Sequence, residues 1–350
     1  MNIRDLSWIT PKIEKANTHH QERISAFYSG QQPKEIIAIA GRMFGRNHGL
    51  AGINDIDMLK KPDEWLDDVL KDMAQYAHES ADMITFKPLT IELDPLGVHY
   101  IDALFGANVY IHDNQTWSDQ LDCDLDDLQM PDLDNSQVFR ESLELARKAV
   151  EITQGKIFIT TPVLSCAINI VINLFGERLL EALIVRPESA KRALQIINDV
   201  IIYCTRAFFE IIPDNIRRNS VACNRFAPDG FGQIDGCATH LVSAKQYVEF
   251  FADLDDEILG VSPNGGMMHL CGTHAQHIPA FKTMKNLRSI QINDRAAEDL
   301  ELYFDGLRSD QIIYVAPTPL LTLERILEIT KGKRLVLQIP LNEPILIDKI

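Results

Sequence analysis

The sequence has a marked deficit of positive charge. It contains 34 lysines and arginines against 50 aspartates and glutamates, which gives a formal net charge of −16 at pH 7. A protein that binds nucleic acid needs clustered lysine and arginine side chains to neutralise phosphates. We therefore expect no nucleic-acid partner.

Long apolar runs and disulfide-type cysteine patterns are also missing. No uninterrupted run reaches the roughly 18 apolar residues that indicate a membrane-spanning helix, and residues 1–5 lack the apolar segment of a signal peptide. The six cysteines are scattered along the 350 residues, which indicates a reducing compartment. We expect a soluble, cytoplasmic protein with no membrane partner.

Two common ligand motifs are absent as well. No Gly-x-Gly-x-x-Gly follows the first apolar strands, so a dinucleotide-binding fold has little support. The acidic segment 119–134 lacks the Asp-x-Asp-x-Asp-Gly frame and distal glutamate of a calcium loop. We interpret this segment as a solvated surface.

What the sequence does contain is a repeated alternation of short apolar strands and helices. Repeated strand–helix units of this kind predict a parallel sheet with helices outside. About eight such strands can be counted, which favours a (β/α)8 TIM barrel over a doubly wound sheet. The predicted organisation is α/β, with a single domain over 1–350 whose first 80 residues include an N-terminal helical extension. Predicted strands are 36–40, 83–86, 107–111, 156–160, 233–238, 289–292, 312–315 and 335–339, besides the strand that carries His269, and the longest predicted helices are 164–185 and 187–212.

The strand at 267–271 ends in a His-x-Cys pair. Residues two apart on a strand point to the same face, so His269 and Cys271 would aim an imidazole and a sulfur at one point. Both are good zinc ligands, although the alternative is two buried residues of an ordinary strand. Polar residues at strand ends line the active sites of barrels, and Asp294 follows the next predicted strand. This common placement favours a metal site.

Other candidate residues surround this pair. The glycine-rich segment 41–49 contains Arg42 and Arg46. It is either an anion-binding loop or a turn whose arginines pair with acidic neighbours. His240 is a further candidate for binding substrate. His274 and His277 are three apart and would share a helix face, and we interpret them as solvent-facing or capping residues.

The order of these motifs resembles the uroporphyrinogen decarboxylase superfamily. That superfamily includes tetrapyrrole decarboxylases, corrinoid-dependent methyltransferases and, more distantly, cobalamin-independent methionine synthase. The resemblance covers most of the chain and implies a (β/α)8 barrel. The segments that carry it are Gln21–Ile24, Thr161–Leu164, Asp235 with Leu241–Ser243, Tyr247–Phe251 and His269–Gly272.

The decarboxylase branch of the superfamily matches only in part. Segment 42–46 is similar to its Arg-x-x-Gly-Arg loop, whose arginines grip substrate carboxylates. However, Pro88, Ile168 and Gly236 stand where that branch has its catalytic aspartate, tyrosine and serine. The branch's C-terminal histidine also has no counterpart in 340–344. We therefore do not expect uroporphyrinogen decarboxylation.

The methyltransferase branch implies a zinc held by His-x-Cys and a later cysteine. Its zinc lowers the pKa of a thiol, which then attacks the methyl group of a corrinoid. His269 and Cys271 match, but no cysteine follows Cys271. Glu343 stands near the expected position of the third ligand, and Cys237 is a further candidate.

The resemblance thus predicts a zinc-dependent methyltransferase-like enzyme that moves a methyl group between a corrinoid and a thiol. The corrinoid would be a co-substrate carried by a methylated partner protein. His269, Cys271 and Glu343 would bind zinc, and Asp294 would be catalytic or would replace Glu343 as the third ligand. Arg42, Arg46 and His240 would bind a small thiol or an anionic substrate. Two alternatives stay open: a metal-free decarboxylase or lyase of an acidic substrate, as in porphyrin metabolism, and a non-catalytic corrinoid- or tetrapyrrole-binding protein.

Overall fold

Two parallel sheets form the centre of the molecule in the computed structural model, which describes residues 2–41, 57–113, 115–219 and 225–339. The larger sheet has the strand order β1-β11-β10-β9-β8-β7 and the smaller has the order β2-β5-β6. The strands of the larger sheet are β1 (Ile37–Ala40), β7 (Gly232–Asp235), β8 (Gly266–Cys271), β9 (Leu287–Asn293), β10 (Ile312–Val315) and β11 (Leu335–Ile339). Those of the smaller sheet are β2 (Thr90–Ile91), β5 (Phe158–Thr160) and β6 (Arg217–Arg218).

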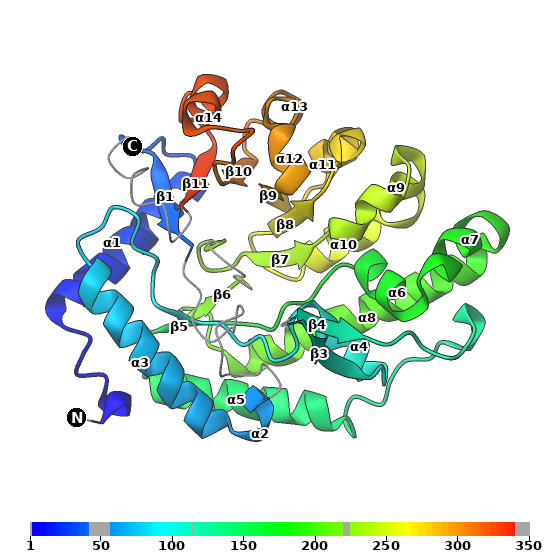
Figure 1. Cartoon of the computed structure of the whole chain (residues 1–350), viewed down its shortest axis with the longest axis horizontal. Coiled ribbons are helices and arrows are strands. Elements are labelled where there is room, and N and C mark those ends of the chain that lie inside the picture. Colours follow the sequence, from blue (N-terminus) through cyan, green and yellow to red (C-terminus); the bar gives the residue numbers. More distant parts are fainter. Residues whose placement is uncertain (1, 42–56, 114, 220–224, 340–350) are drawn as a thin grey trace.

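Helices cover the outside of these strands (Figure 1). The α-helices are α1 (Pro11–Tyr28), α2 (Asp57–Lys60), α3 (Pro62–Ser80), α4 (Tyr100–Leu104), α5 (Gln137–Thr153), α6 (Ala167–Phe175), α7 (Glu177–Val185), α8 (Pro187–Ile211), α9 (Ala244–Phe250), α10 (Ala252–Leu259), α11 (Ile278–Thr283), α12 (Asp294–Glu298), α13 (Leu300–Gly306) and α14 (Leu323–Thr330). Short 3₁₀ helices are η1 (Ile3–Asp5), η2 (Gly97–His99), η3 (Leu125–Asp127), η4 (Cys237–Leu241) and η5 (Ala275–His277). None of the described helices has the length and hydropathy that crossing a bilayer requires.

The predicted α/β class is confirmed, whereas the closed eight-stranded barrel stays a prediction. Within the described ranges, strand pairing joins neither β1 to β2 nor β6 to β7. A single backbone hydrogen bond, from the Ala40 amide to the Thr85 carbonyl (2.9 Å), connects the end of β1 to the segment before β2. The parallel strands therefore form two arcs with a seam at each junction.

Several element boundaries differ from the predictions for local reasons. The helix predicted over 164–185 is two helices, because Gly176 adopts φ 59° between α6 and α7. Such a left-handed backbone breaks a helix and favours glycine. Residues 83–86 do not form a strand, and the next described strand after β1 is β2, which begins at Thr90. The strand predicted at 107–111 is an antiparallel hairpin, β3 (Val109–His112) with β4 (Gln115–Ser118), outside the parallel sheets.

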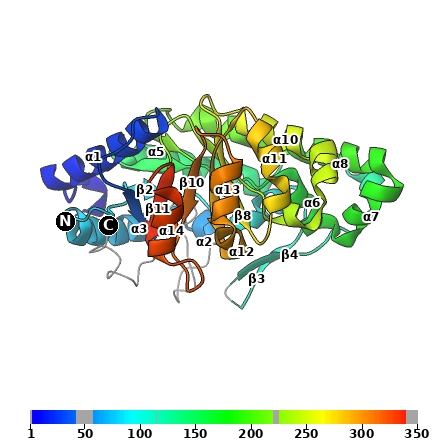
Figure 2. The same ribbon diagram turned by 90° about the horizontal axis from the view of Figure 1, so that it is seen from above.

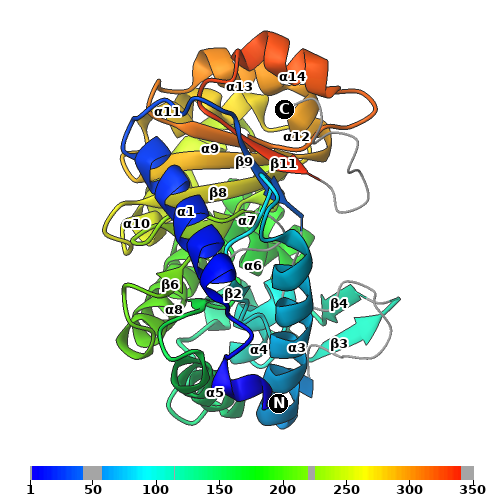
Figure 3. The same cartoon turned by 90° about the vertical axis from the view of Figure 1, so that its left-hand side faces the viewer.

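The hairpin and the N-terminal helices mark two sides of the molecule. The β3–β4 hairpin projects away from the body (Figure 2). Helices α1 and α3 run along the side that faces the viewer in Figure 3. The first 80 residues contain α1, α2 and α3 and also contribute β1 to the larger sheet.

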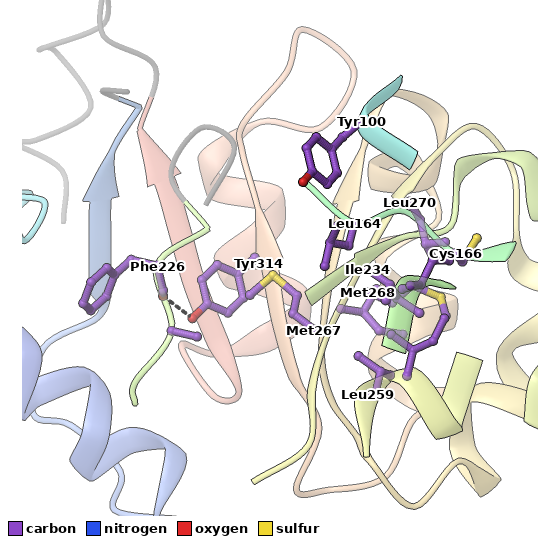
Figure 4. Close-up of a cluster of buried hydrophobic side chains, with 14 of the residues drawn as sticks. Tyr100, Leu164, Cys166, Phe226, Ile234, Leu259, Met267, Met268, Leu270 and Tyr314 are labelled. Atoms are coloured by element: carbon purple, nitrogen blue, oxygen red, sulfur yellow. Dashed lines mark hydrogen bonds between the residues drawn. The ribbon is translucent and has the colours of Figure 1, made fainter. Parts of the chain in front are cut away.

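Strand β8 lies in the larger sheet between β7 and β9 and divides its side chains between two faces. Met268 packs near Ile234 and Leu259, whereas Met267 is directed toward Tyr314 (Figure 4). The Tyr314 hydroxyl donates a hydrogen bond to the Phe226 carbonyl (2.8 Å) on that inner side. Because side chains alternate along a strand, His269 and Cys271 lie on the same inner face as Met267.

Candidate metal centre

Three neighbouring strands end at one place in the larger sheet. Strand β8 pairs in parallel with β7 on one side and with β9 on the other. In this register His269 lies opposite Asp235 and Gln291, and Cys271 lies opposite Asn293. The carboxyl ends of the three strands therefore bring their last residues, and the residues that follow them, to one rim.

Cys237, His269 and Cys271 form a compact group of metal-binding side chains at this rim. One ligand atom from each lies within 4.8 Å of the others, and the Cys271 sulfur is 3.0 Å from His269 Nε2. Ligands of a tetrahedral zinc at about 2.0–2.3 Å lie about 3.3–3.8 Å from one another. The spacing and the N/S₂ donor set therefore fit a thiophilic ion, and with three protein ligands a fourth position is left for another molecule.

Cys237 reaches this group from the neighbouring strand. It is the first residue of η4, two positions past the end of β7. Its backbone is fixed by Asn169 of α6, whose side chain donates to the Asp235 carbonyl (2.8 Å) and accepts from the Ala238 amide (2.8 Å). The sequence indicated Cys237 only as a further candidate, because no short spacing connects it to the His-x-Cys pair.

Gln291 holds the imidazole of His269 in one orientation. The ring nitrogen Nδ1 of His269 contacts Gln291 Oε1, and the Gln291 amide nitrogen donates to Gln338 Oε1 (2.9 Å) on β11. Since that amide nitrogen is already directed at Gln338, Oε1 is the atom that accepts the hydrogen bond from the Nδ1–H group of His269. Nε2 is therefore the ring nitrogen left to bind a metal, and it faces Cys271, whose sulfur is 3.0 Å away.

The two cysteine sulfurs share one proton. The Cys237 thiol donates a hydrogen bond that lowers the pKa of Cys271 well below that of a free thiol, and His269 adds to this effect against the opposing effect of burial. The same contact, together with burial, raises the pKa of Cys237. Cys271 is therefore the sulfur that carries the negative charge, and a thiolate is the form that binds metals.

Asp294 lies next to this thiolate at the end of β9. Partial desolvation raises the pKa of its carboxyl, and the negative charge of Cys271 raises it further. The residue is exposed and begins α12 with φ 47°, a left-handed conformation that is uncommon outside glycine. The carboxyl is thus at the open edge of the group, beside the sulfur and accessible to a substrate.

A buried ion pair between Arg225 and Asp235 lies next to His269. Arg225 donates to Asp235 Oδ1 (2.8 Å), and both side chains are buried. Burial alone would raise the pKa of Asp235, but the charges of Arg225 and His269 and hydrogen bonds from Gln233 and Arg225 lower it on balance. The carboxylate therefore stays ionised next to His269, its partner in the β7–β8 register.

One of the three flanking histidines is exposed and the other two are buried. His240 is exposed, and its Nδ1 donates to the Cys237 carbonyl (2.6 Å). The interpretation of His274 and His277 as solvent-facing is wrong, because both are fully buried. His274 Nδ1 is 2.9 Å from the Thr239 hydroxyl, and His277 Nε2 donates to the Thr239 carbonyl (2.9 Å). Through these contacts with Thr239, the two rings connect η4, which contains Cys237, to the segment that follows β8.

Comparisons with known proteins bear on the fold. No family model and no curated protein matches the sequence. The structure matches a methyltransferase from Methanosarcina mazei with a TM-score of 0.63, over 91% of this chain and 92% of that chain, at 12% sequence identity. The two proteins share a fold. Membership of the uroporphyrinogen decarboxylase superfamily stays a prediction.

Three predicted site residues lie outside the described part of the chain: Arg42, Arg46 and Glu343. Of the others, the structure brings His269, Cys271 and Asp294 together and places His240 beside Cys237. Sequence reasoning did not find Gln291. The sequence did contain an indication of its position. Gln291 lies two residues before Asn293 on the predicted strand, so its side chain points to the same face as that of Asn293.

Proposed function

We propose that this protein is a zinc-dependent methyltransferase that transfers a methyl group between a corrinoid and a thiol. The observation that carries the proposal is the convergence of Cys237, His269 and Cys271 at the ends of neighbouring parallel strands. The fold shared with a methyltransferase supports the reaction class. We also propose that the two arcs of strands belong to one (β/α)8 barrel.

His269 Nε2 and the two sulfurs would hold the zinc, and a substrate thiol would take the remaining position. Zinc bound there lowers the pKa of a thiol, so that the thiol reacts as a thiolate. Gln291 fixes the ring that supplies the nitrogen. Asp294, whose pKa is raised by burial and by the Cys271 charge, would accept the proton that the thiol loses.

The bond changes in this reaction balance without an added oxidant or reductant. In the direction of thiol methylation, the substrate sulfur forms a bond to the methyl carbon while the carbon–cobalt bond breaks. The electron pair of that bond stays on cobalt, and the thiol proton goes to Asp294. The exposed His240, with Arg42 and Arg46, would bind the anionic part of the substrate, and the corrinoid would arrive on a partner protein.

The first experiment is elemental analysis of protein purified under reducing conditions without chelators. We expect about one zinc per chain, and loss of that zinc in the variants Cys237→Ser, His269→Ala and Cys271→Ala. Cys123→Ser is the matched control, because Cys123 is a free cysteine outside the group. Methyl transfer from methylcobalamin to small thiols, followed by the corrinoid's visible spectrum under anaerobic conditions, should be lost in the same three variants.

Two results would count against this function. The zinc-dependent function would be contradicted if the wild-type protein did not contain stoichiometric zinc. It would also be contradicted if the Cys271→Ala variant retained the wild-type zinc content. If Arg46→Ala abolishes the binding of an acidic ligand while Cys271→Ala leaves turnover intact, the metal-free lyase is the better description.

A further inference from the structure

Two cysteines reach the rim of the larger sheet as neighbours. Asp235 of β7 is the register partner of His269 of β8, and the Gly236 amide donates to the His269 carbonyl (2.8 Å), so the pairing extends past the end of β7. Cys237 and Cys271 each follow two residues after these register partners. Neighbouring strands lie about 4.8 Å apart, and the Cα atoms of a disulfide lie about 4.4–6.8 Å apart. The register thus brings the two cysteines together at about the spacing that a disulfide needs.

The side chains of the two cysteines also point toward one another. Both are free thiols, and both sulfurs belong to the group whose ligand atoms lie within 4.8 Å of one another. The Cys237 thiol donates a hydrogen bond to the Cys271 sulfur. Because the sulfur atoms of a disulfide are about 2.05 Å apart, a gap of less than about 3 Å would have to close.

The surroundings of this pair favour reaction with an oxidant. Neither cysteine is fully buried, in contrast to Cys166 and Cys204. Cys271 carries a negative charge that is stabilised by Cys237 and by His269, whose Nε2 is 3.0 Å from the sulfur. A partly exposed thiolate reacts with peroxides, and a neighbouring thiol then converts the product to a disulfide. The pair therefore contains both the attacking sulfur and the sulfur that completes the reaction.

We propose that Cys237 and Cys271 form a peroxide-sensitive switch, in which hydrogen peroxide converts the metal-free pair to a reversible disulfide. The Cys271 thiolate attacks one oxygen of the peroxide, the O–O bond breaks, and the leaving hydroxide takes up a proton to become water. The Cys237 sulfur then bonds to the sulfur of the sulfenic acid, whose hydroxyl leaves with the Cys237 proton as a second water. Two electrons pass from the sulfurs to the peroxide.

The disulfide would remove two of the three ligands of the candidate metal centre and leave only His269. Zinc binds thiolates, so the oxidised protein would lose its metal. This regulatory consequence rests on the proposed function, whereas formation of the disulfide does not. Disulfides in reducing compartments are commonly transient and redox-sensing, and reduction by small thiols would restore the ligands.

The first test treats the full-length protein, freed of metal by a chelator under argon, with a stoichiometric amount of hydrogen peroxide. The remaining thiols are alkylated under denaturing conditions, and mass spectrometry of the digest locates the linkage. We expect a peptide that contains Cys237 to be joined to one that contains Cys271, and dithiothreitol to separate them. Cys123→Ser, which removes a free cysteine outside the group, is the matched control and should give the same linkage. Recovery of Cys271 as sulfinic acid beside a free Cys237 thiol would overturn the proposal.

Two variants separate the attack on peroxide from the closure of the disulfide. In Cys237→Ser, Cys271 should accumulate as a sulfenic acid that dimedone labels, and should then be oxidised to sulfinic acid. In Cys271→Ser, Cys237 should remain a free thiol at the same dose of peroxide. Labelling of Cys237 in place of Cys271 would overturn the assigned order of the two steps.

Release of zinc from the zinc-loaded wild type tests the regulatory consequence without a variant. A chromophoric chelator should detect one zinc for each disulfide formed, and dithiothreitol should restore the capacity to bind zinc. A disulfide in a protein that never binds zinc would contradict the proposed function and leave the cysteine chemistry intact. Stoichiometric zinc binding together with no disulfide in the peroxide-treated, metal-free protein would overturn the switch and leave the proposed function intact.

Discussion

At the scale of single residues, the chemistry of the rim depends on side chains that would not touch a metal. Gln291 selects the tautomer of His269, and Gln338 in turn fixes the amide of Gln291. Hydrogen bonds of this kind orient metal ligands and increase their basicity. The ligand geometry is therefore set by residues from three strands, β8, β9 and β11.

Replacing Gln291 with leucine should weaken metal binding without removing a ligand. We expect zinc affinity to fall about 10- to 100-fold, because the imidazole loses the acceptor for its Nδ1 proton. Competition with a chromophoric chelator measures the change. Gln291→Glu, which retains an acceptor oxygen, should keep affinity near the wild-type value, and an unchanged affinity in Gln291→Leu would show that the contact does not orient His269.

A second residue-scale prediction concerns Asp255, a buried carboxyl in α10. Burial raises its pKa to about 7, and the Tyr247 hydroxyl donates to it (2.7 Å). The folded protein therefore holds this proton to higher pH than the unfolded chain does. Its contribution to stability is complete below the unfolded pKa, near 3.8, and is lost as the pH rises through the folded pKa.

Urea unfolding of wild type and Asp255→Asn across this range measures the effect. Between about pH 5 and pH 7 the wild-type free energy of unfolding should fall by roughly 2 kcal/mol more than that of the variant. Asparagine keeps an oxygen for the Tyr247 hydroxyl but does not titrate. Parallel pH profiles for the two proteins would contradict the raised pKa.

How much of the site was predictable follows from where its residues lie in the chain. His269 and Cys271 are two apart on one strand, so strand alternation was enough to place them on one face. Cys237 is far from them in sequence and joins them only through the β7–β8 register, which sequence patterns do not specify. His274 and His277 were misassigned because helical spacing does not show which face of a short helix is covered.

At the scale of elements, the predictions were best where the strand is almost entirely apolar. Strands β10 and β11 have the predicted boundaries, 312–315 and 335–339. Strand β6 was missed because it consists of Arg217 and Arg218, which read as surface residues although both are buried. Burial of those arginines depends on Phe209 and Phe158 from other elements, whose rings lie against the guanidinium groups.

The N-terminal cap of helix α9, a helix next to the site, is expected to stabilise the fold. Ser243 and Gln246 form a capping box at its N-terminus, directly after η4. Ser243→Ala should reduce the free energy of unfolding by about 1 kcal/mol, because amides of the first turn lose their acceptor. Chemical denaturation measures this loss. Ser243→Asp, which also caps helices, should lose much less, and equal losses in the two variants would argue against a capping role.

At the scale of the whole molecule, stability should be unevenly distributed. Strands β9 and β10 have a hydrogen-bonded neighbour on each side, whereas β3 and β4 pair only with each other and project from the body (Figure 2). An isolated two-stranded hairpin is marginally stable in water. The hairpin is therefore the part of the described chain that we expect to open most often.

Hydrogen exchange followed by mass spectrometry tests this distribution. Amides of β3 and β4 should exchange at least about 100-fold faster than those of β9 and β10, since local opening is less costly than opening the central sheet. Similar protection in the hairpin and the sheet would mean that the hairpin is held by contacts beyond its own strand pairing.

The closeness of the Cys237 and Cys271 sulfurs also bears on how the protein has to be handled. A thiolate beside a thiol reacts readily with oxidants. Oxidation of metal-free protein in air would modify both sulfurs, and the damage would then resemble an intrinsic inability to bind zinc. Preparations kept under argon with a phosphine reductant, and reconstituted before any exposure to oxygen, avoid this false negative.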